Sequence, residues 1–258
     1  DMILFATETG VDQSKSGATW VHDLVGIQPF ARSVELKQAC YSATAAIQLA
    51  MGHIALHPES KVLVLATDIA KYGEKTIEKE SAAFTKDIDD FWRPNYSEFA
   101  FVDGKYSNQA YLDTLMASWN RYKEQFDAEL SAFESLLFHV PYTKMGRKAL
   151  EALADEMDET TTERFNDYYE SAIVYNKTVG NVYTGSLYLS LISLLEQADE
   201  LPADARIGMF SYGSGAVGEF FVGKIQSRYK EFIEKENHEA LLNDREKLSI
   251  EEYEGILS

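Results

Sequence analysis

Residues 33–47 read SVELKQACYSATAAI, and this stretch decides the fold. Residues 33–36 are typical of a short strand, and the small residues that begin at Cys40 predict a helix that continues to about His57, before Pro58. The single cysteine of the chain is therefore expected between a strand and a helix.

The neighbouring segments repeat this order. Residues 2–6 form an apolar run typical of a buried strand, and residues 14–24 predict the helix that follows it. Residues 61–67 form a third, nearly continuous apolar run. Strand, helix, strand, helix, strand at this spacing predicts a parallel α/β sheet that is covered by helices on both faces.

The remaining sequence continues the mixed pattern. We expect helices over residues 108–126, 142–157, 161–173 and 186–195, strands over 135–138, 206–210 and 216–222, and a hairpin turn at 211–215. Residues 74–86 are charged and short of apolar residues, and residues 87–104 suggest an irregular loop. Since neither an internal repeat nor a low-complexity linker is recognisable, residues 1–258 are expected to form one domain, with a charged helical segment at 225–258.

Composition excludes several classes of protein. The 24 lysines and arginines against 42 aspartates and glutamates give a formal net charge of −18, which disfavours binding to nucleic acid or to an anionic membrane. One cysteine cannot form an internal disulfide, so we expect a reducing compartment, the cytoplasm. No run approaches the roughly 18 apolar residues that cross a bilayer, and no export signal is recognisable.

Three reactive side chains are expected at the carboxyl ends of strands, where the ligand sites of open α/β folds gather. Cys40 precedes a helix whose dipole favours the nucleophilic thiolate, and the alternative is a buried structural cysteine. Glu8 can serve as a general base or acid, and the alternative is a solvated loop carboxylate. His139 is preferred over the other four histidines, which fall in predicted helices or in the charged tail.

The helix predicted just after His139 carries three basic residues at positions i, i+3 and i+4: Lys144, Arg147 and Lys148. They share one helix face. Because the chain as a whole is acidic, this basic face is a candidate phosphate-binding site. An ordinary solvated helix face would explain the same three residues equally well.

The turn at residues 211–215 is a candidate oxyanion pocket, because the backbone amides of Tyr212, Gly213 and Ser214 can converge there. A simple hairpin is equally consistent with this sequence. No metal site is expected, since no paired Cys/His spacing, His-Glu-x-x-His motif or calcium loop occurs. The turn also lacks the G-x-S-x-G elbow of a serine hydrolase.

Five separate segments carry a family resemblance. They are ATETGVDQSK (residues 6–15), ELKQACY (35–41), FHVPYTKMG (138–146), VGNVYTGS (179–186) and FSYGSG (210–215). In this order they resemble bacterial hydroxymethylglutaryl-CoA synthases, which are condensing enzymes of the thiolase superfamily.

The resemblance implies a layered αβαβα thiolase-like fold, a homodimer, and the condensation of acetyl-CoA with acetoacetyl-CoA. The products would be 3-hydroxy-3-methylglutaryl-CoA and CoA, in the mevalonate pathway, with CoA thioesters as substrates and no further cofactor. It also implies that the fold is incomplete in this chain. The family's first strands and helices, its longer Gly-rich stretch at the place of residues 74–86, and its C-terminal end have no counterpart here.

The resemblance further implies roles for single residues. Cys40 would carry the acetyl group as a thioester, Glu8 would remove a methyl proton, and His139 would polarise the acetoacetyl carbonyl. The substrate-binding residues would be Asn181 at the acetoacetyl group, Tyr212, Gly213 and Ser214 at the thioester carbonyl, and Lys144 and Lys148 at the CoA phosphates.

Two alternatives stay open. One is a β-branching synthase that takes its acceptor from an acyl-carrier protein. The other is a non-catalytic fragment that binds CoA thioesters without turnover.

Overall fold

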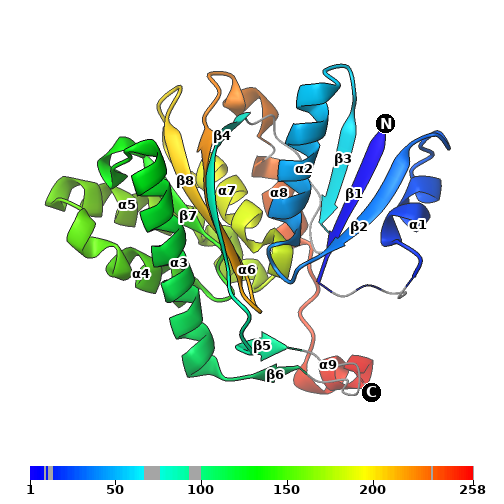
Figure 1. The fold of residues 1–258 in the computed structure, drawn as a ribbon. Helices are drawn as coiled ribbons and strands as arrows, with labels where there is room; N and C mark the ends of the chain where they lie inside the picture. Colours follow the sequence, from blue (N-terminus) through cyan, green and yellow to red (C-terminus); the bar gives the residue numbers. More distant parts are fainter. Residues whose placement is uncertain (9, 11–13, 67–75, 93–99, 234, 258) are drawn as a thin grey trace.

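The computed structural model describes residues 1–8, 10, 14–66, 76–92, 100–233 and 235–257. Thr9 and residues 11–13, which belong to the first resemblance segment, and Thr67, which belongs to the third predicted strand, lie outside the described residues. Two main sheets organise the described chain, with strand orders β2-β1-β3 and β4-β9-β8-β7 (Figure 1).

The first sheet is built as the sequence predicts. Its strands β1 (Met2–Thr7), β2 (Arg32–Lys37) and β3 (Val62–Ala66) are parallel, with β1 in the centre. Helix α1 (Gly17–Leu24) connects β1 to β2, and helix α2 (Ser42–Leu56) connects β2 to β3.

The two helices cover opposite faces of this sheet, because side chains alternate along a strand. Leu4 and Ala6 of β1 pack in one cluster with the small residues of α2, among them Ala46. The intervening Phe5 packs against α1 so closely that its ring leaves no room for a Cβ at Gly17.

The second sheet is mixed. Its strands are β4 (Thr76–Thr85), β7 (Ser135–Phe138), β8 (Arg206–Gly213) and β9 (Val217–Lys224). β7 runs parallel to β8, whereas β8 and β9, and β9 and β4, are antiparallel. One prediction is wrong here, because residues 211–213 belong to β8 and the turn is shorter than predicted. Residues 76–85, for which no element was predicted, form the strand β4.

β4 was not recognised as a strand because of its charged residues. β4 is an edge strand, and its carboxylates Glu78 and Glu80 bind the Arg206 guanidinium of β8 instead of entering a core. A register shift between Ile77 and Ser81 further disturbs the alternation of polar and apolar residues.

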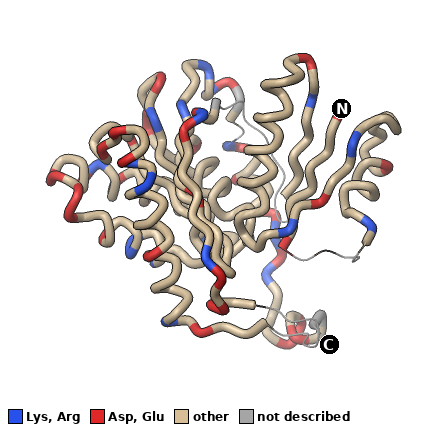
Figure 2. Tube along the Cα trace, viewed as in Figure 1, with Lys and Arg blue, Asp and Glu red and all other residues tan. Residues whose placement is uncertain are grey.

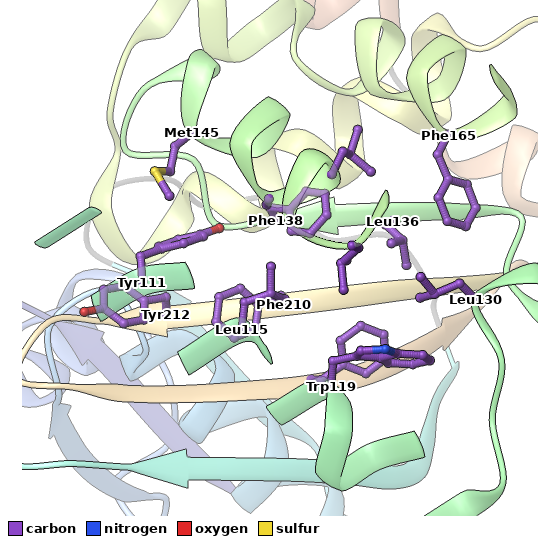
Figure 3. Close-up of a cluster of buried hydrophobic side chains, with 14 of the residues drawn as sticks. Tyr111, Leu115, Trp119, Leu130, Leu136, Phe138, Met145, Phe165, Phe210 and Tyr212 are labelled. Carbon is purple, nitrogen blue, oxygen red and sulfur yellow. The ribbon is translucent and has the colours of Figure 1, made fainter. Parts of the chain in front are cut away.

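Helices cover both faces of the second sheet. On one face lie α3 (Gly104–Phe126), α4 (Thr143–Ala152) and α5 (Glu159–Ala172), and on the other lies α7 (Ser186–Gln197). Figure 3 shows the first face, where side chains such as Trp119 of α3 meet strand residues of β7 and β8. The opposite-facing strand residues pack against the leucines of α7.

Smaller elements complete the described chain. β5 (Phe91–Trp92) and β6 (Phe101–Val102) form a hairpin inside the segment predicted as an irregular loop, and α6 (Val174–Val179) was not predicted. Helices α8 (Lys235–Asn243) and α9 (Ile250–Leu257) lie in the charged segment that was predicted to be helical.

Helices α2 and α7 lie between the two sheets (Figure 1). The Thr44 hydroxyl of α2 is 2.7 Å from the Tyr188 hydroxyl of α7 and donates to Ser211 Oγ of β8 at 2.9 Å. Three hydroxyl groups therefore join α2, α7 and the second sheet.

The charged and apolar segments are distributed differently. Figure 2 shows no charge along β1 and β3, whereas acidic and basic residues are spread over the helices and loops. Among the described residues, one window, Ala39–Leu56, is long and apolar enough for a membrane span by length and composition alone, with a mean hydropathy of 1.2. The helix of this window is α2, and core helices of soluble proteins also pass this test.

Candidate active site

Cys40 lies in a tight turn between β2 and α2. Ala39 has a φ of 41°, in the left-handed region that residues with a Cβ seldom adopt. The Ser42 hydroxyl accepts a hydrogen bond from the Gln38 amide at 2.6 Å and donates to the Thr7 carbonyl at 3.1 Å. These contacts fix the half-buried Cys40 just before the beginning of α2.

Glu8 lies next to this cysteine. It directly follows β1, whose last residue, Thr7, is paired with Lys37 of β2. Because parallel strands end at the same edge of a sheet, Glu8 and Cys40 come together, and the Cys40 thiol donates to Glu8 Oε2 at 3.5 Å. A thiol and a carboxylate in contact can divide acyl transfer and proton transfer between them.

His139 directly follows β7 and is 2% exposed. Its amide donates to the Phe210 carbonyl of β8 at 2.8 Å, and its own carbonyl accepts from the Tyr111 hydroxyl at 2.8 Å. Burial lowers the pKa of the imidazole to about 4, and Nδ1 has no hydrogen-bond partner among the described residues. The ring is therefore neutral near pH 7.

The end of β8 connects the histidine to the cysteine turn. Asp90, which is fully buried, accepts from the Tyr212 hydroxyl at 2.8 Å and from the Gly215 amide at 2.9 Å. Burial and the Asp90 carboxylate raise the pKa of Tyr212. A Cβ at Gly213 would lie 2.7 Å from the Gln38 carbonyl oxygen, so this strand end packs directly on the backbone that carries Cys40.

A buried carboxylate anchors the residue after the cysteine. Glu219 of β9 is 3% exposed and accepts from the Tyr41 hydroxyl at 2.7 Å and from Gln48 Nε2 at 2.8 Å. Burial, with the nearby Glu219 charge, raises the pKa of Tyr41. The first turns of α2 are thereby fixed to the second sheet.

Asn181 lies in a turn that reaches the same helix. The Thr184 hydroxyl of this turn accepts from the Ala43 amide at 2.7 Å, three residues after Cys40. Asn181 itself is exposed, and its Oδ1 is the acceptor of hydrogen bonds within the turn.

The three basic residues of the predicted face on α4 have different environments. Arg147 forms an ion pair with Glu170 of α5, and Lys148 Nζ donates to the Tyr142 hydroxyl at 3.4 Å, while Lys144 is exposed. Since α4 covers the face of the second sheet opposite α7, these residues lie in an outer layer.

The structure thus brings Cys40 and Glu8 into contact, and it links His139 and Asn181 to them through β8 and α2. Asp90 and Glu219 were not predicted from the sequence, because nothing in an acidic sequence distinguishes one buried carboxylate from its exposed neighbours. Over the described residues no group of three His, Cys, Asp or Glu side chains could hold a metal ion.

Sequence comparisons identify relatives over the whole chain. A family model for the C-terminal part of hydroxymethylglutaryl-coenzyme A synthase matches residues 76–154 and 151–258. The chain is 46% identical to the hydroxymethylglutaryl-CoA synthase of Enterococcus faecalis over 281 residues, which cover 100% of this chain and 73% of the relative. It is 27% identical to the polyketide biosynthesis 3-hydroxy-3-methylglutaryl-ACP synthase PksG of Bacillus subtilis, over 98% of this chain and 70% of that protein.

Solved structures agree with these relatives. An HMG-CoA synthase crystallised with CoA superposes with a TM-score of 0.91 at 44% identity, over 98% of this chain and 71% of the other. The HMG synthase of the curacin biosynthetic pathway superposes with a TM-score of 0.89 at 29% identity, over 100% of this chain and 70% of the other. The predicted layered thiolase-like fold is therefore confirmed.

Proposed function

Because this chain belongs to the hydroxymethylglutaryl-CoA synthase family, we propose that it condenses acetyl-CoA with acetoacetyl-CoA, with Cys40 as the acetyl carrier. The products are 3-hydroxy-3-methylglutaryl-CoA and CoA, and the reaction places the protein in the mevalonate pathway. The observation that carries the proposal is the contact of the Cys40 thiol with Glu8 Oε2 at 3.5 Å, at the carboxyl edge of the first sheet.

The reaction begins with acyl transfer. The Cys40 sulfur attacks the thioester carbonyl of acetyl-CoA, the bond to the CoA sulfur breaks, and CoA leaves as the thiol with the proton that Cys40 gives up. The acetyl group is then held as a thioester beside Glu8. An enzyme-bound thioester divides one difficult condensation into easier steps.

Condensation follows from the acetylated enzyme. The Glu8 carboxylate removes a proton from the acetyl methyl group, and the resulting carbon nucleophile attacks the ketone carbon of acetoacetyl-CoA. The buried, neutral His139 donates a hydrogen bond to the carbonyl oxygen on which negative charge develops. Protonation of this oxygen and hydrolysis of the Cys40 thioester by one water molecule release the product and the free thiol.

The remaining expectations belong to the same proposal. Tyr212, Gly213 and Ser214 lie at the thioester carbonyl, and Lys144 and Lys148 bind the CoA phosphates from the outer layer. The enzyme acts in the cytoplasm without a further cofactor.

The proposal includes a homodimer. Its support is three highly exposed apolar side chains in and between the elements around the first sheet: Leu24 at the end of α1, Phe30 before β2 and Leu56 at the end of α2, which are 84%, 90% and 79% exposed. Exposed apolar groups of this kind mark association surfaces. Light scattering of the purified protein measures the oligomeric state, and a monomeric mass would contradict this part of the proposal.

Acetyl labelling tests the proposed function. Radiolabelled acetyl-CoA should label the protein, Cys40→Ser should abolish the label, and Glu8→Gln should retain the label but lose condensation. Ser33→Ala, an alteration in β2 away from the thiol turn, serves as the matched control. Label that persists on Cys40→Ser would refute the assignment.

The acceptor distinguishes this function from its alternatives. Since the relative that acts on acyl-carrier protein is only 27% identical, against 46% for the CoA-dependent one, we expect free acetoacetyl-CoA to be the faster acceptor. A faster reaction with the carrier-bound acceptor would favour a β-branching synthase. Calorimetric binding of CoA thioesters without any product would favour a non-catalytic binding protein.

A further inference from the structure

The amide group of Asn181 has a fixed orientation. Its Oδ1 accepts hydrogen bonds from the Tyr183 backbone amide at 2.9 Å and from the Ser186 hydroxyl at 3.0 Å. A backbone N–H can only donate, so the atom that faces Tyr183 must be the oxygen. The other end of the amide, Nδ2, has no hydrogen-bond partner in the described part of the chain, and the residue is exposed.

Ser186 is well placed to hold this orientation. It is fully buried at the start of α7, and its Oγ accepts from the Val182 amide at 3.1 Å while it donates to Asn181. The hydroxyl therefore has a defined donor direction, toward the Asn181 oxygen. The turn is constrained further because Tyr183 has a φ of 48°, in the left-handed region.

The turn also has a defined position relative to the nucleophile. The Thr184 hydroxyl accepts from the Ala43 amide at 2.7 Å, in the first turn of the helix that follows Cys40. The turn that carries Asn181 is therefore fixed to the helix that begins beside Cys40.

We propose that Ser186 is a positioning residue that fixes the Asn181 amide with its oxygen inward, so that only Nδ2–H is offered to a carbonyl oxygen of the acetoacetyl group. The inference rests on the proposed function and adds the polarity of this contact and the residue that sets it. The contact serves the acceptor half of the reaction and leaves the acetylation of Cys40 untouched. A preorganised donor of this kind stabilises negative charge without rearrangement during the reaction.

Asn181→Asp is the direct test, because it retains the side-chain oxygens for Tyr183 and Ser186 and removes the donor. Acetylation of Cys40 should proceed at the wild-type rate, whereas kcat/KM for acetoacetyl-CoA should fall by about 100-fold, the effect of one lost oxyanion donor. Asn120→Asp, on an exposed position of α3, makes the same chemical change away from the turn and should leave both rates unchanged.

Ser186→Ala tests the positioning role. Loss of one of the two hydrogen bonds to Oδ1 should lower kcat/KM for acetoacetyl-CoA roughly tenfold without a change in acetylation. Ser193→Ala is the matched control, since Ser193 is equally buried on α7 and its hydroxyl donates to the Ser171 carbonyl instead.

The outcomes separate this inference from the proposed function. A wild-type protein that is never acetylated contradicts the function itself. A wild-type protein that condenses normally, with Asn181→Asp equally active, contradicts the inference. Equal losses of acetylation and condensation in Ser186→Ala, or the same loss in Ser193→Ala, would show a merely structural effect and overturn the positioning role.

Discussion

Gly213 should tolerate no side chain, because it lies where β8 packs on the turn that carries the nucleophile. A Cβ built there would be 2.7 Å from the Gln38 carbonyl oxygen and 2.9 Å from both the backbone amide and the Cβ of Tyr41. These are mainly backbone atoms, which cannot rotate away. Gly213 does not have a positive φ, so the cost of Gly213→Ala comes from this contact alone.

The size of the effect follows from the distances. Ordinary van der Waals contact begins near 3.4 Å, so the backbone around Cys40 must move by roughly 0.7 Å to accept the methyl group. Inserting a methyl group into a packed site typically costs about 1–3 kcal/mol of the free energy of unfolding. The same movement displaces the turn that carries the Cys40 thiol, and a misplacement of about 1 Å can cost about 100-fold in rate, so the rate of Cys40 acetylation should fall by about 100-fold.

Gly52→Ala provides the control. Gly52 lies within α2, and a Cβ there meets no atom within 4 Å. Alanine is the better helix former, so this variant should gain about 1 kcal/mol of unfolding free energy and retain the acetylation rate. Urea unfolding and the labelling assay measure the two quantities. A Gly213→Ala protein with wild-type stability and wild-type acetylation would refute the packing argument.

Two further predictions concern stability. Arg206→Ala should cost about 1–2 kcal/mol of unfolding free energy, since its half-buried guanidinium binds Glu78 through two nitrogens, whereas Arg228→Ala, which removes an exposed ion pair, should cause no measurable change. His139 should make stability depend on pH, because its pKa of about 4 in the folded protein lies below the 6.5 of an unperturbed imidazole. His139→Gln should therefore remove about 2 kcal/mol of the difference in unfolding free energy between pH 7 and pH 5.

The sign of the His139 effect follows from proton binding. Between pH 6.5 and pH 4 the His139 imidazole is protonated in the unfolded chain but stays neutral in the folded protein. The contribution of His139 to the free energy of unfolding is therefore fully present above pH 6.5 and is lost as the pH falls through this window. Urea titrations at the two pH values measure it, and an unchanged pH difference in the variant would contradict the assigned burial. Equal losses in Arg206→Ala and Arg228→Ala would contradict the stability argument for the ion pairs.

The sequence predicted the elements whose pattern is local. The apolar runs of β1 and β3 and the small-residue helix α2 identified the parallel sheet, and the positions of Glu8 and Cys40 followed from it. The position of His139 followed from the separate apolar run of β7. β4 could not be found in this way, because an edge strand with its charges paired to Arg206 lacks the alternation of a half-buried strand.

The contacts that shape the site depend on residues far apart in the chain. Tyr41 and Glu219 are separated by 178 positions, and Tyr212 and Asp90 by 122. No local pattern distinguishes such carboxylates from the many solvated ones in a chain of net charge −18. The orientation of the Asn181 amide likewise depends on the folded turn and not on its sequence.

The hydroxyl groups of Thr44, Tyr188 and Ser211 have a consequence for protein engineering. They come from a helix of the first half of the chain and from a helix and a strand of the second. A chimera that joins the first half of one homologue to the second half of another inherits all three partners only by coincidence. We therefore expect recombination between homologues to preserve activity when these three positions are exchanged as a set.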